Sequence, residues 1–318
     1  MEIEPTELSI GQLGFSIAKP LVVAGIPAFN EEESIARVVL EAQKFADIVI
    51  VCDDGSEDMT AEIAERLGAD VVRHKENSGY GAAIRTLFDR AQELGADVLV
   101  TLDADGQHDA NEIPSVVKPI IEGEADIVIG SRFIDNKGSL EMPLYRRIGA
   151  KLITKIVNGS AKNGVSDSQS GFRAYNRQAL ERLNVFEPGM GASVEILLEA
   201  SKYDLRIFEV PSSCKYERGG VATSTEHPVK HGVGVVMSIL RLIVEERPLT
   251  ALGIPGMLCL LTGVGFGAWM LQIYSVEHYI VTNIALFSIG FLVIGFFVVM
   301  TALMLYGNTR LFRRLKVR

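Results

Sequence analysis

Short apolar runs alternate with helical patterns from residue 20 to residue 130 of the chain. The runs, rich in Val and Ile, occupy residues 21–26, 47–52, 70–73, 97–102 and 126–130. Apolar side chains repeat at a period of about 3.6 residues between them, at residues 31–45, 59–67, 81–94 and 111–122. Strands that are apolar throughout and separated by helices are typical of a mostly parallel sheet with helices on both faces. The pattern therefore predicts an α/β fold of Rossmann-like type, in which ligands bind beyond the carboxyl ends of the strands.

The pattern continues less regularly after residue 130. It predicts a helix at residues 145–158, a polar turn at 166–175, a helix at 192–202, a strand at 206–210 and a Gly-, Ser- and Thr-rich loop at 214–230. Residues 231–248 follow, with Val235, Ile239 and Leu242 on one side and Arg241 and Glu245 elsewhere. This distribution favours an amphipathic helix at a membrane surface, with an ordinary packing helix as the alternative.

Two stretches near the end of the chain are long enough to cross a membrane. Residues 249–274 and 281–306 contain no Asp, Glu, Lys or Arg. As helices they would each extend about 39 Å, which exceeds the roughly 30 Å hydrocarbon core of a bilayer. The short connection at 275–280 predicts a helical hairpin whose two ends lie on the same side of the membrane. Because the tail at 307–318 is basic and carries no acid, that side is expected to be cytoplasmic.

Composition and charge limit the classes of protein that remain. The 48% hydrophobic content fits an integral membrane protein, and the net charge of −9 argues against nucleic acid as a partner. The first residues resemble no signal peptide, and Cys52, Cys214 and Cys259 lack metal-ligand spacing, which predicts reduced thiols. The expected organisation is an N-terminal extension at 1–19, a cytosolic catalytic domain at 20–230, an interfacial helix at 231–248, a membrane hairpin at 249–306 and the tail.

Polar side chains follow the predicted strands at the points where the strands end. The segments are PAFNEEES at 27–34, DDGSED at 53–58, DADGQHD at 103–109 and GSRF at 130–133. Because the carboxyl ends of parallel strands meet at the same edge of a sheet, these segments should converge on one crevice.

Asp103 and Asp105 point to a divalent metal in that crevice. Two carboxylates one residue apart can share a Mg²⁺ ion, which keeps its other positions for water and substrate phosphates. An EF-hand calcium loop is excluded, because its sixth and twelfth positions would be His108 and Pro114 rather than Gly and Glu. A haloacid-dehalogenase-type phosphatase also uses D-x-D-G, but after the first strand of its domain rather than the fourth. A purely structural role, in which the carboxylates cap a turn, would explain one Asp. It explains poorly why Asp103, Asp105 and Gln107 occur together.

Arginines near these segments are candidate phosphate ligands. Arg132 follows the fifth strand, a helix begins with Arg146 and Arg147, Arg173 lies in the polar turn and Arg218 lies in the loop. A guanidinium group matches a phosphate bidentately, so several of them beside a metal site suggest more than one phosphate. Each arginine alone is equally compatible with a surface salt bridge.

In order and spacing, PAFNEEES, DDGSED, DADGQ, GSRF and SDSQSGFRAY resemble the family 2 glycosyltransferases of GT-A fold. Within that family, the chain is similar to the polyprenyl- and dolichyl-phosphate hexose synthases, which commonly end in membrane helices. The resemblance covers roughly residues 20–230. It implies transfer of a hexose-type sugar, with inversion and a divalent metal (Mg²⁺ or Mn²⁺), from a nucleoside diphosphate sugar to a polyprenyl or dolichyl phosphate. Two alternatives are a membrane-anchored phosphatase of the DxD type and a membrane protein that binds nucleotide sugars without turnover.

The resemblance also implies roles for residues of this chain. The nucleotide is expected on Pro27, Ala28, Asn30, Glu31, Asp53, Asp54, Asp103 and Ala104. The metal is expected on Asp103, Asp105 and Gln107, and the residues expected to be catalytic are Asp105, Asp167 and Arg132. The acceptor phosphate is expected on Arg132, Arg146 and Arg147, and the donor diphosphate on Arg218. The resemblance is also compatible with a homo-oligomer.

Two departures from the family pattern narrow the expected reaction. Mannosyl members often carry an Arg-x-x-Gly-x-Ser-Lys loop, whereas this loop reads ERGGVATSTEH and lacks the Lys, so mannose is not favoured. Processive synthases carry Gln-x-x-Arg-Trp, whereas the single Trp of this chain, Trp269, lies in a predicted span. A single transfer is therefore expected rather than polymerisation.

Overall fold

A seven-stranded sheet forms the centre of the part of the chain before residue 215. The computed structural model describes residues 19–135, 144–160, 164–214, 244 and 248–315. The strands lie in the order β3-β2-β1-β4-β6-β5-β7. Their bounds are Val22–Ala28 (β1), Ile48–Asp53 (β2), Asp70–Arg73 (β3), Val98–Thr101 (β4), Ile127–Ser131 (β5), Arg173–Asn176 (β6) and Ile207–Pro211 (β7). All neighbours pair in parallel except β6, which runs antiparallel to β4 and β5. The predicted mostly parallel sheet is confirmed.

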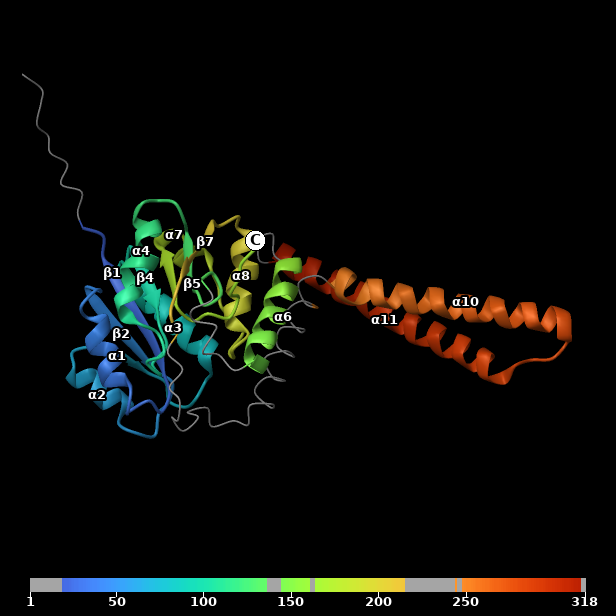
Figure 1. The fold of residues 1–318 in the computed structure, drawn as a ribbon, viewed down its shortest axis with the longest axis horizontal. Coiled ribbons are helices and arrows are strands. Elements are labelled where there is room, and N and C mark those ends of the chain that lie inside the picture. The colour runs from blue at the N-terminus through green and yellow to red at the C-terminus, as the bar shows by residue number, and fades with distance from the viewer. Residues whose placement is uncertain (1–18, 136–143, 161–163, 215–243, 245–247, 316–318) are drawn as a thin grey trace, which may run out of the picture.

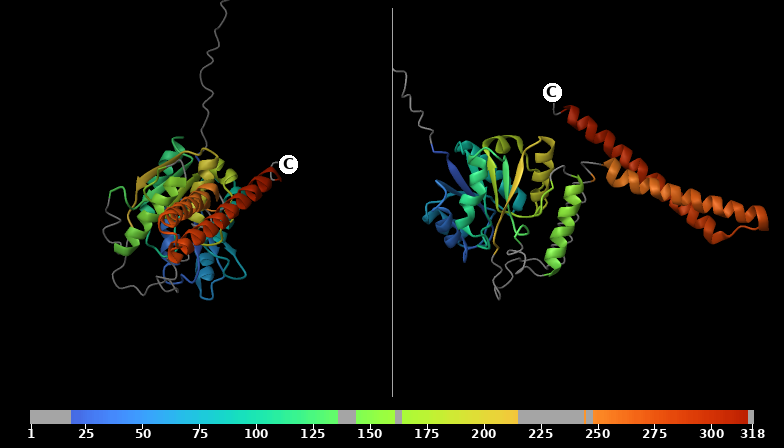
Figure 2. Two further views of the ribbon diagram at one scale, coloured as in Figure 1. Left: turned by 90° about the vertical axis from the view of Figure 1, so that its right-hand side faces the viewer. Right: turned by 45° about the horizontal axis from the view of Figure 1, so that its top comes forward.

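Helices cover both faces of the sheet (Figures 1 and 2). One face packs against α1 (Ile35–Ala42), α2 (Thr60–Arg66) and α4 (Ile113–Ile121). The other packs against α3 (Tyr80–Glu93), α6 (Leu144–Ser160), α7 (Arg177–Arg182) and α8 (Ala192–Lys202). Successive strand residues point to opposite faces, so Leu99 joins the core under α3 while Val98 and Val100 join the core under α4. Burial on both faces explains why these strands are apolar throughout.

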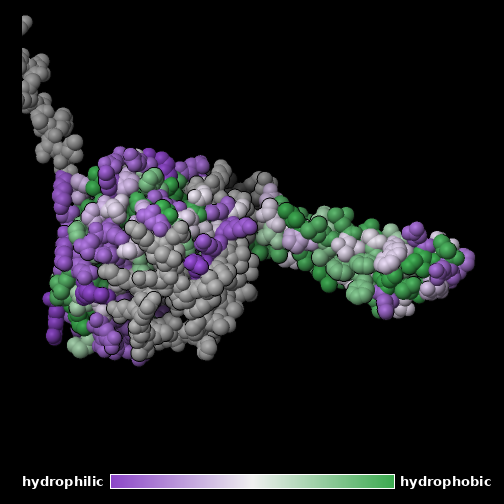
Figure 3. Space-filling model, viewed as in Figure 1, coloured by the Kyte–Doolittle hydropathy of each residue, from purple (hydrophilic) through white to green (hydrophobic). Residues whose placement is uncertain are grey.

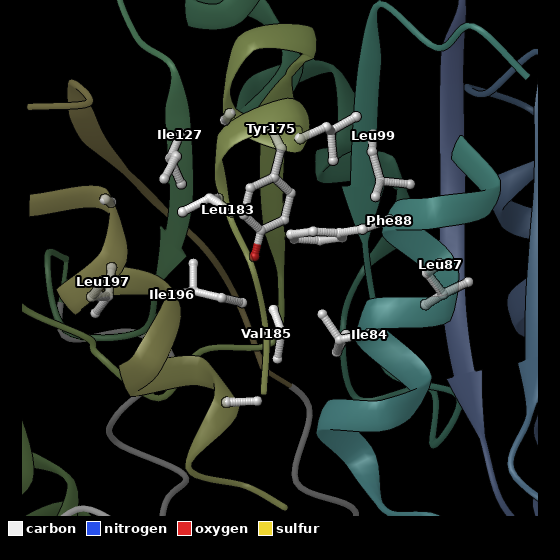
Figure 4. Packing of buried hydrophobic residues seen from close by; sticks show 14 of the residues in the cluster. Ile84, Leu87, Phe88, Leu99, Ile127, Tyr175, Leu183, Val185, Ile196 and Leu197 are labelled. Carbon is white, nitrogen blue, oxygen red and sulfur yellow. The ribbon is translucent and has the colours of Figure 1, made fainter. Parts of the chain in front are cut away.

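Figure 4 shows how the core under α3, α7 and α8 is filled. The rings of Phe88 from α3 and Tyr175 from β6 meet edge to face with centroids 4.8 Å apart. Leu99 and Ile127 reach this layer from β4 and β5. Aromatic pairs in this geometry add to the free energy gained by burying their surface.

The prediction of a polar turn at residues 166–175 is wrong in its last part. Residues 173–176 form strand β6, which lies between β4 and β5 and is followed directly by α7. The strand has only Ala174 and Tyr175 as apolar residues, one facing each core. So short an apolar segment gives no periodicity signal, and its pairing with strands on both sides holds it in the sheet.

The C-terminal segment forms a helical hairpin that extends away from the sheet (Figures 1 and 2). A π-helical turn at Leu249–Gly253 leads into α10 (Ile254–Glu277), which packs against α11 (Thr282–Leu315). The Ser288 hydroxyl donates a hydrogen bond across the pair to the Gly263 carbonyl at 2.8 Å. The other faces are exposed and strongly apolar (Figure 3). By length and composition both helices can cross a membrane, which makes the hairpin a candidate membrane anchor.

Two sequence expectations fall largely outside the described residues. The interfacial helix expected at 231–248 is described only at residues 244 and 248, and the loop expected at 214–230 only at Cys214. Helix α11 continues to Leu315, through most of the segment expected as a basic tail.

Gly81→Ala is expected to lower the free energy of unfolding by about 2 kcal/mol, as overpacking of a tight contact does. A Cβ atom at residue 81 would collide with the Glu187 carbonyl oxygen and lie 2.9 Å from the Ala192 Cβ atom. The N-terminal end of α3 and the segment before α8 would then have to separate. Thermal unfolding of the full chain in detergent measures the change as a lower Tm.

Gly149→Ala is the matched control for this substitution. A Cβ atom at residue 149 meets no atom within 4 Å, and the residue lies inside α6. Because Ala favours a helix over Gly by about 1 kcal/mol, this variant should be as stable as the wild type or more so. Equal losses in the two variants would contradict the packing account.

Candidate functional site

The sheet brings the polar segments together at one edge. Register places Ala28 beside Asp53, and Thr101 beside both Gly25 and Arg173. Because β6 runs antiparallel, it is the start of β6 that lies at this edge, next to the ends of β4 and β5. The loops before β6 therefore join the loops after β1, β2, β4, β5 and β7 around a single site.

The turn at residues 103–108, called here the acid turn, is held by its own hydrogen bonds and by α1. The Gln107 N–H donates to Asp105 Oδ1 at 2.9 Å, and the Arg37 guanidinium donates to the Gly106 carbonyl at 3.3 Å. The Asp103 carboxylate lies directly over Gly171, where a Cβ atom would be 2.6 Å from Asp103 Oδ1. Only glycine at position 171 leaves room for the carboxylate in this place.

Three carboxylates repel one another around the acid turn. Burial, followed by the charge of Asp103, raises the pKa of Asp105. Burial also raises the pKa of Glu31, and the charges of Asp105 and Asp103 raise it further. Such mutual repulsion is relieved by a bound cation, and oxygen ligands suit Mg²⁺ or Mn²⁺.

The residues of the acid turn fit a metal that shares its coordination with a ligand. Among the described residues, no group of three or more His, Cys, Asp and Glu side chains is placed to hold a metal ion. If Asp103, Asp105 and Gln107 held a cation, two carboxylates and an amide oxygen would leave its other positions open. That is the arrangement expected when substrate phosphates complete the shell.

The loops after β1 and β2 are tied to each other. The Asn30 N–H donates to the Ser56 hydroxyl at 2.9 Å, and Asn30 Oδ1 accepts from the Glu57 N–H at 2.9 Å. The Asp53 carboxylate accepts from the Ser56 N–H at 3.3 Å. The Asp54 carboxylate is turned inward, where it accepts from the backbone N–H groups of Ser78 and Gly79. Asp54, unlike its neighbour Asp53, therefore anchors the loop to the start of α3.

Asp167, before β6, and Arg132, directly after β5, form a bidentate ion pair. Arg132 Nε donates to Asp167 Oδ2 at 2.7 Å and Arg132 Nη2 donates to Oδ1 at 2.9 Å. The Asp167 side chain is fully buried, whereas Arg132 keeps 16% of its side-chain surface exposed. The Arg132 guanidinium also lies 5.9 Å from the Phe133 ring centroid, with the Lys151 ammonium 5.7 Å from the same ring. Asp167 thus orients Arg132 and is not itself open to solvent.

The structure places the other predicted arginines differently. Arg173 is only 1% exposed and donates to the backbone carbonyls of Ser168, Ser170 and Ser193, so its interpretation as a phosphate ligand is wrong. Arg147 lies half-buried on α6. The side chain of Arg146 and all of Arg218 fall outside the described part of the chain.

The sequence pattern assigns no role to His108, the last residue of the acid turn, and the structure shows what its ring contacts. Its Nδ1 atom accepts from the Asp103 N–H at 3.3 Å, and its ring stacks on Phe172 with centroids 5.5 Å apart. His108 pairs with Cys214 in an isolated β-bridge, and the Cys214 thiol donates to Gln107 Oε1 at 3.6 Å. Only its place in the acid turn could have marked His108, because a single histidine has no periodicity. Cys52, Cys214 and Cys259 are free thiols; Cys52 and Cys214 are buried, as expected of reduced core cysteines, whereas Cys259 is half-buried.

Residues 24–183 match the family described as Glycosyl transferase family 2. The chain belongs to this family, so the protein is a glycosyltransferase and the resemblance found in its motifs is confirmed.

Two relatives of this chain are named as dolichyl-phosphate sugar transferases. The chain is 35% identical over 232 residues to the UDP-N-acetylglucosamine--dolichyl-phosphate N-acetylglucosaminyltransferase of Methanococcus voltae, covering 66% of this chain and 91% of the relative. It is 32% identical over 223 residues to the dolichyl-phosphate hexose transferase of Haloferax volcanii, covering 69% and 92%. A crystal structure of glucosyl-3-phosphoglycerate synthase from Mycobacterium tuberculosis, in complex with Mn²⁺, UDP and glucosyl-3-phosphoglycerate, aligns with a TM-score of 0.53. Its identity is 22%, over 76% of this chain and 86% of that one, which shows a shared fold.

Asp167→Asn is expected to lower the free energy of unfolding by about 3 kcal/mol, the cost of breaking a buried ion pair from one side. Asn keeps the size of the side chain but leaves the Arg132 guanidinium without its counter-charge. Chemical denaturation of the full chain in detergent measures the loss.

Glu93→Gln is the control for this substitution, because it breaks an exposed ion pair of similar length. Glu93 accepts from Arg90 at 2.8 Å, with side-chain exposures of 64% and 35%. Its loss should change the free energy of unfolding by less than about 1 kcal/mol. A control loss as large as that of Asp167→Asn would contradict the distinction drawn between the two pairs.

Proposed function

We propose that this glycosyltransferase moves a hexose-type sugar from a nucleoside diphosphate sugar to a polyprenyl or dolichyl phosphate at the cytoplasmic face of a membrane. The observation that carries the proposal is the acid turn at the edge of the sheet, beside the loops after β1 and β2. The apolar hairpin supports a lipid acceptor, because such a substrate stays in the bilayer. The names of the Methanococcus voltae and Haloferax volcanii relatives support the same class of acceptor.

The donor side of the site is proposed to use the edges of β1, β2 and β4. The residues proposed to surround the nucleotide are Pro27, Ala28, Asn30, Glu31, Asp53, Asp54, Asp103 and Ala104. Asp54 would act indirectly, because its carboxylate holds the loop through the Ser78 and Gly79 N–H groups. Asp103, Asp105 and Gln107 would hold a divalent metal, Mg²⁺ or Mn²⁺. The metal would supply positive charge to the leaving diphosphate. Arg218 is the proposed second donor of positive charge to that diphosphate.

The acceptor side is proposed to use positive charge in place of a general base. A phosphate monoester has a second pKa near 6 and is therefore largely dianionic at neutral pH. Its oxygen can attack the anomeric carbon from the face opposite the leaving group, which inverts that carbon. Arg132, with Arg146 and Arg147, would place the acceptor anion beside the donor anion. The buried Asp167 supports this reading, because it is paired with Arg132 and accessible to no substrate proton.

Asp103→Ala and Asp105→Ala are each expected to reduce sugar transfer by about a hundredfold or more, because losing even an outer-shell partner of a metal site costs about 10- to 100-fold and these carboxylates are proposed as direct ligands. They should also remove the stabilisation that nucleotide and metal give together. Transfer is measured with the full chain in vesicles containing polyprenyl phosphate. Thermal shifts with UDP or GDP sugars and Mn²⁺ measure binding, because a bound ligand raises Tm by mass action.

Glu124→Ala is the matched control, since Glu124 is an exposed carboxylate on the loop before β5, at the opposite edge of the sheet. It should transfer at the wild-type rate. Retained transfer in either aspartate variant would contradict the proposed metal site. Release of phosphate from a simple aryl phosphate, without release of a nucleoside diphosphate from sugar donors, would instead indicate a phosphatase.

A further inference from the structure

The His74 ring lies between Asp54 and Cys52, behind the side of the site proposed to hold the donor. His74 follows β3, Cys52 belongs to β2 and Asp54 comes directly after β2. The His74 Nδ1 atom is 2.6 Å from Asp54 Oδ1, and its Nε2 atom is 2.9 Å from the Thr86 hydroxyl and 3.5 Å from the Cys52 sulfur. The order resembles a thiol, base and acid arranged for nucleophilic catalysis.

The environment of Cys52 excludes that reading. The residue has no exposed surface, and burial, followed by the charge of Asp54, raises the pKa of its thiol to about 12. The thiolate is the reactive form of cysteine, and it is scarce at neutral pH when the pKa lies so high. The group is therefore not a nucleophilic triad, and its shortest contact is the one between His74 and Asp54.

Hydrogen-bond chemistry fixes the role of the ring in that contact. A carboxylate accepts hydrogen bonds, so His74 Nδ1 must carry the proton and donate to Asp54. The Thr86 hydroxyl can donate or accept and satisfies Nε2 in either case. The His74 side chain is 17% exposed and that of Asp54 is 6% exposed, so water competes little for this bond.

Asp54 joins the ends of several elements at the donor side. Its carboxylate accepts from the N–H groups of Ser78 and Gly79 at 2.9 and 2.8 Å, and its own N–H donates to the Ala28 carbonyl at 2.8 Å. The His74 N–H donates to the Asp53 carbonyl at 2.9 Å. Gly55 packs closely against the neighbouring loop. A Cβ atom at residue 55 would lie 2.6 Å from the Glu76 carbonyl carbon. The position of residues 53–56 therefore depends on this set of contacts.

We propose that His74 is a positioning residue for the donor nucleotide. Its bond to Asp54 holds residues 53–56, and through Ser56 the Asn30 loop, in the conformation that receives the nucleotide. The inference rests on the proposed function, because it takes these loops as the nucleotide site. His74 contacts neither Asp103 nor Asp105, so its loss should weaken donor binding and leave the rate of transfer at saturating donor unchanged.

Two isosteric substitutions separate the two ring nitrogens. The amide nitrogen of Asn occupies the place of Nδ1, so His74→Asn keeps a donor to Asp54, whereas the longer His74→Gln keeps a donor near Nε2 only. Calorimetric titration of the full chain in detergent with UDP, and separately with GDP, in the presence of Mn²⁺ gives the Kd. His74→Gln should raise the Kd about ten- to hundredfold, the range for losing a hydrogen bond to a charged group, and His74→Asn should restore it to within about threefold.

Lys75→Ala is the control, because Lys75 is the exposed neighbour of His74 and should leave the Kd unchanged. Equal Kd values for the wild type and His74→Gln would overturn the inference, as would equal weakening by His74→Asn and His74→Gln at matched Tm. If His74→Gln does not fold, Asp54→Asn tests the same bond from the carboxylate side, because it removes the charge to which the His74 Nδ1–H donates, and it should also raise the Kd. A wild-type chain that binds neither UDP nor GDP would overturn the proposed function as well.

Discussion

The direction of strand β6 is the constraint on which the site depends. In a wholly parallel sheet, the segment before β6 would reach the edge opposite the acid turn. Because β6 runs antiparallel between β4 and β5, its leading loop lies instead at the carboxyl ends of its neighbours. Gly171 then lies under the Asp103 carboxylate, and Asp167 reaches Arg132. The buried Arg173 fastens this loop by donating to its backbone carbonyls, so the same short strand supports both charged groups.

Charges at this edge are either paired within the protein or left for a ligand. Asp167 is fully buried, and its charge is balanced by Arg132 with good bidentate geometry. Asp54 is balanced by backbone N–H groups and His74. Asp105 and Glu31 have raised pKa values because burial and neighbouring carboxylates both oppose their charge. His108 and Arg37 balance this charge only in part, since the pKa of Asp105 stays raised, so a cation at the acid turn would relieve the remaining repulsion.

The sequence allowed most of the fold to be predicted, because long elements carry periodicity. Strands β1, β2, β4 and β5 are apolar runs covered on both faces, and parallel pairing predicts the edge where their polar ends meet. Strand β6 and helix α7 could not be found in this way, since each is short and held mainly by tertiary contacts. Among site residues, the sequence pattern marked Asp54 and Arg173 as candidate ligands. It did not predict that both side chains turn inward, toward the protein. Which groups turn inward depends on hydrogen-bond partners that are distant in sequence, such as Gly79 and Ser193.

The two sides of the site differ in charge, and this difference bears on how two anionic substrates can meet. The side proposed to hold the donor carries Glu31, Asp53, Asp103 and Asp105, whereas Arg132, Arg147 and Lys151 lie on the side of β5 and α6. Under the proposed reaction, a diphosphate could approach the first side only together with a cation, while a phosphate monoester could approach the second directly. A metal would then act as a condition for donor binding as well as a stabiliser of the leaving group. In that reaction an acceptor phosphate, already ionised, would need orientation more than activation, and a guanidinium held rigidly by a buried carboxylate would supply it.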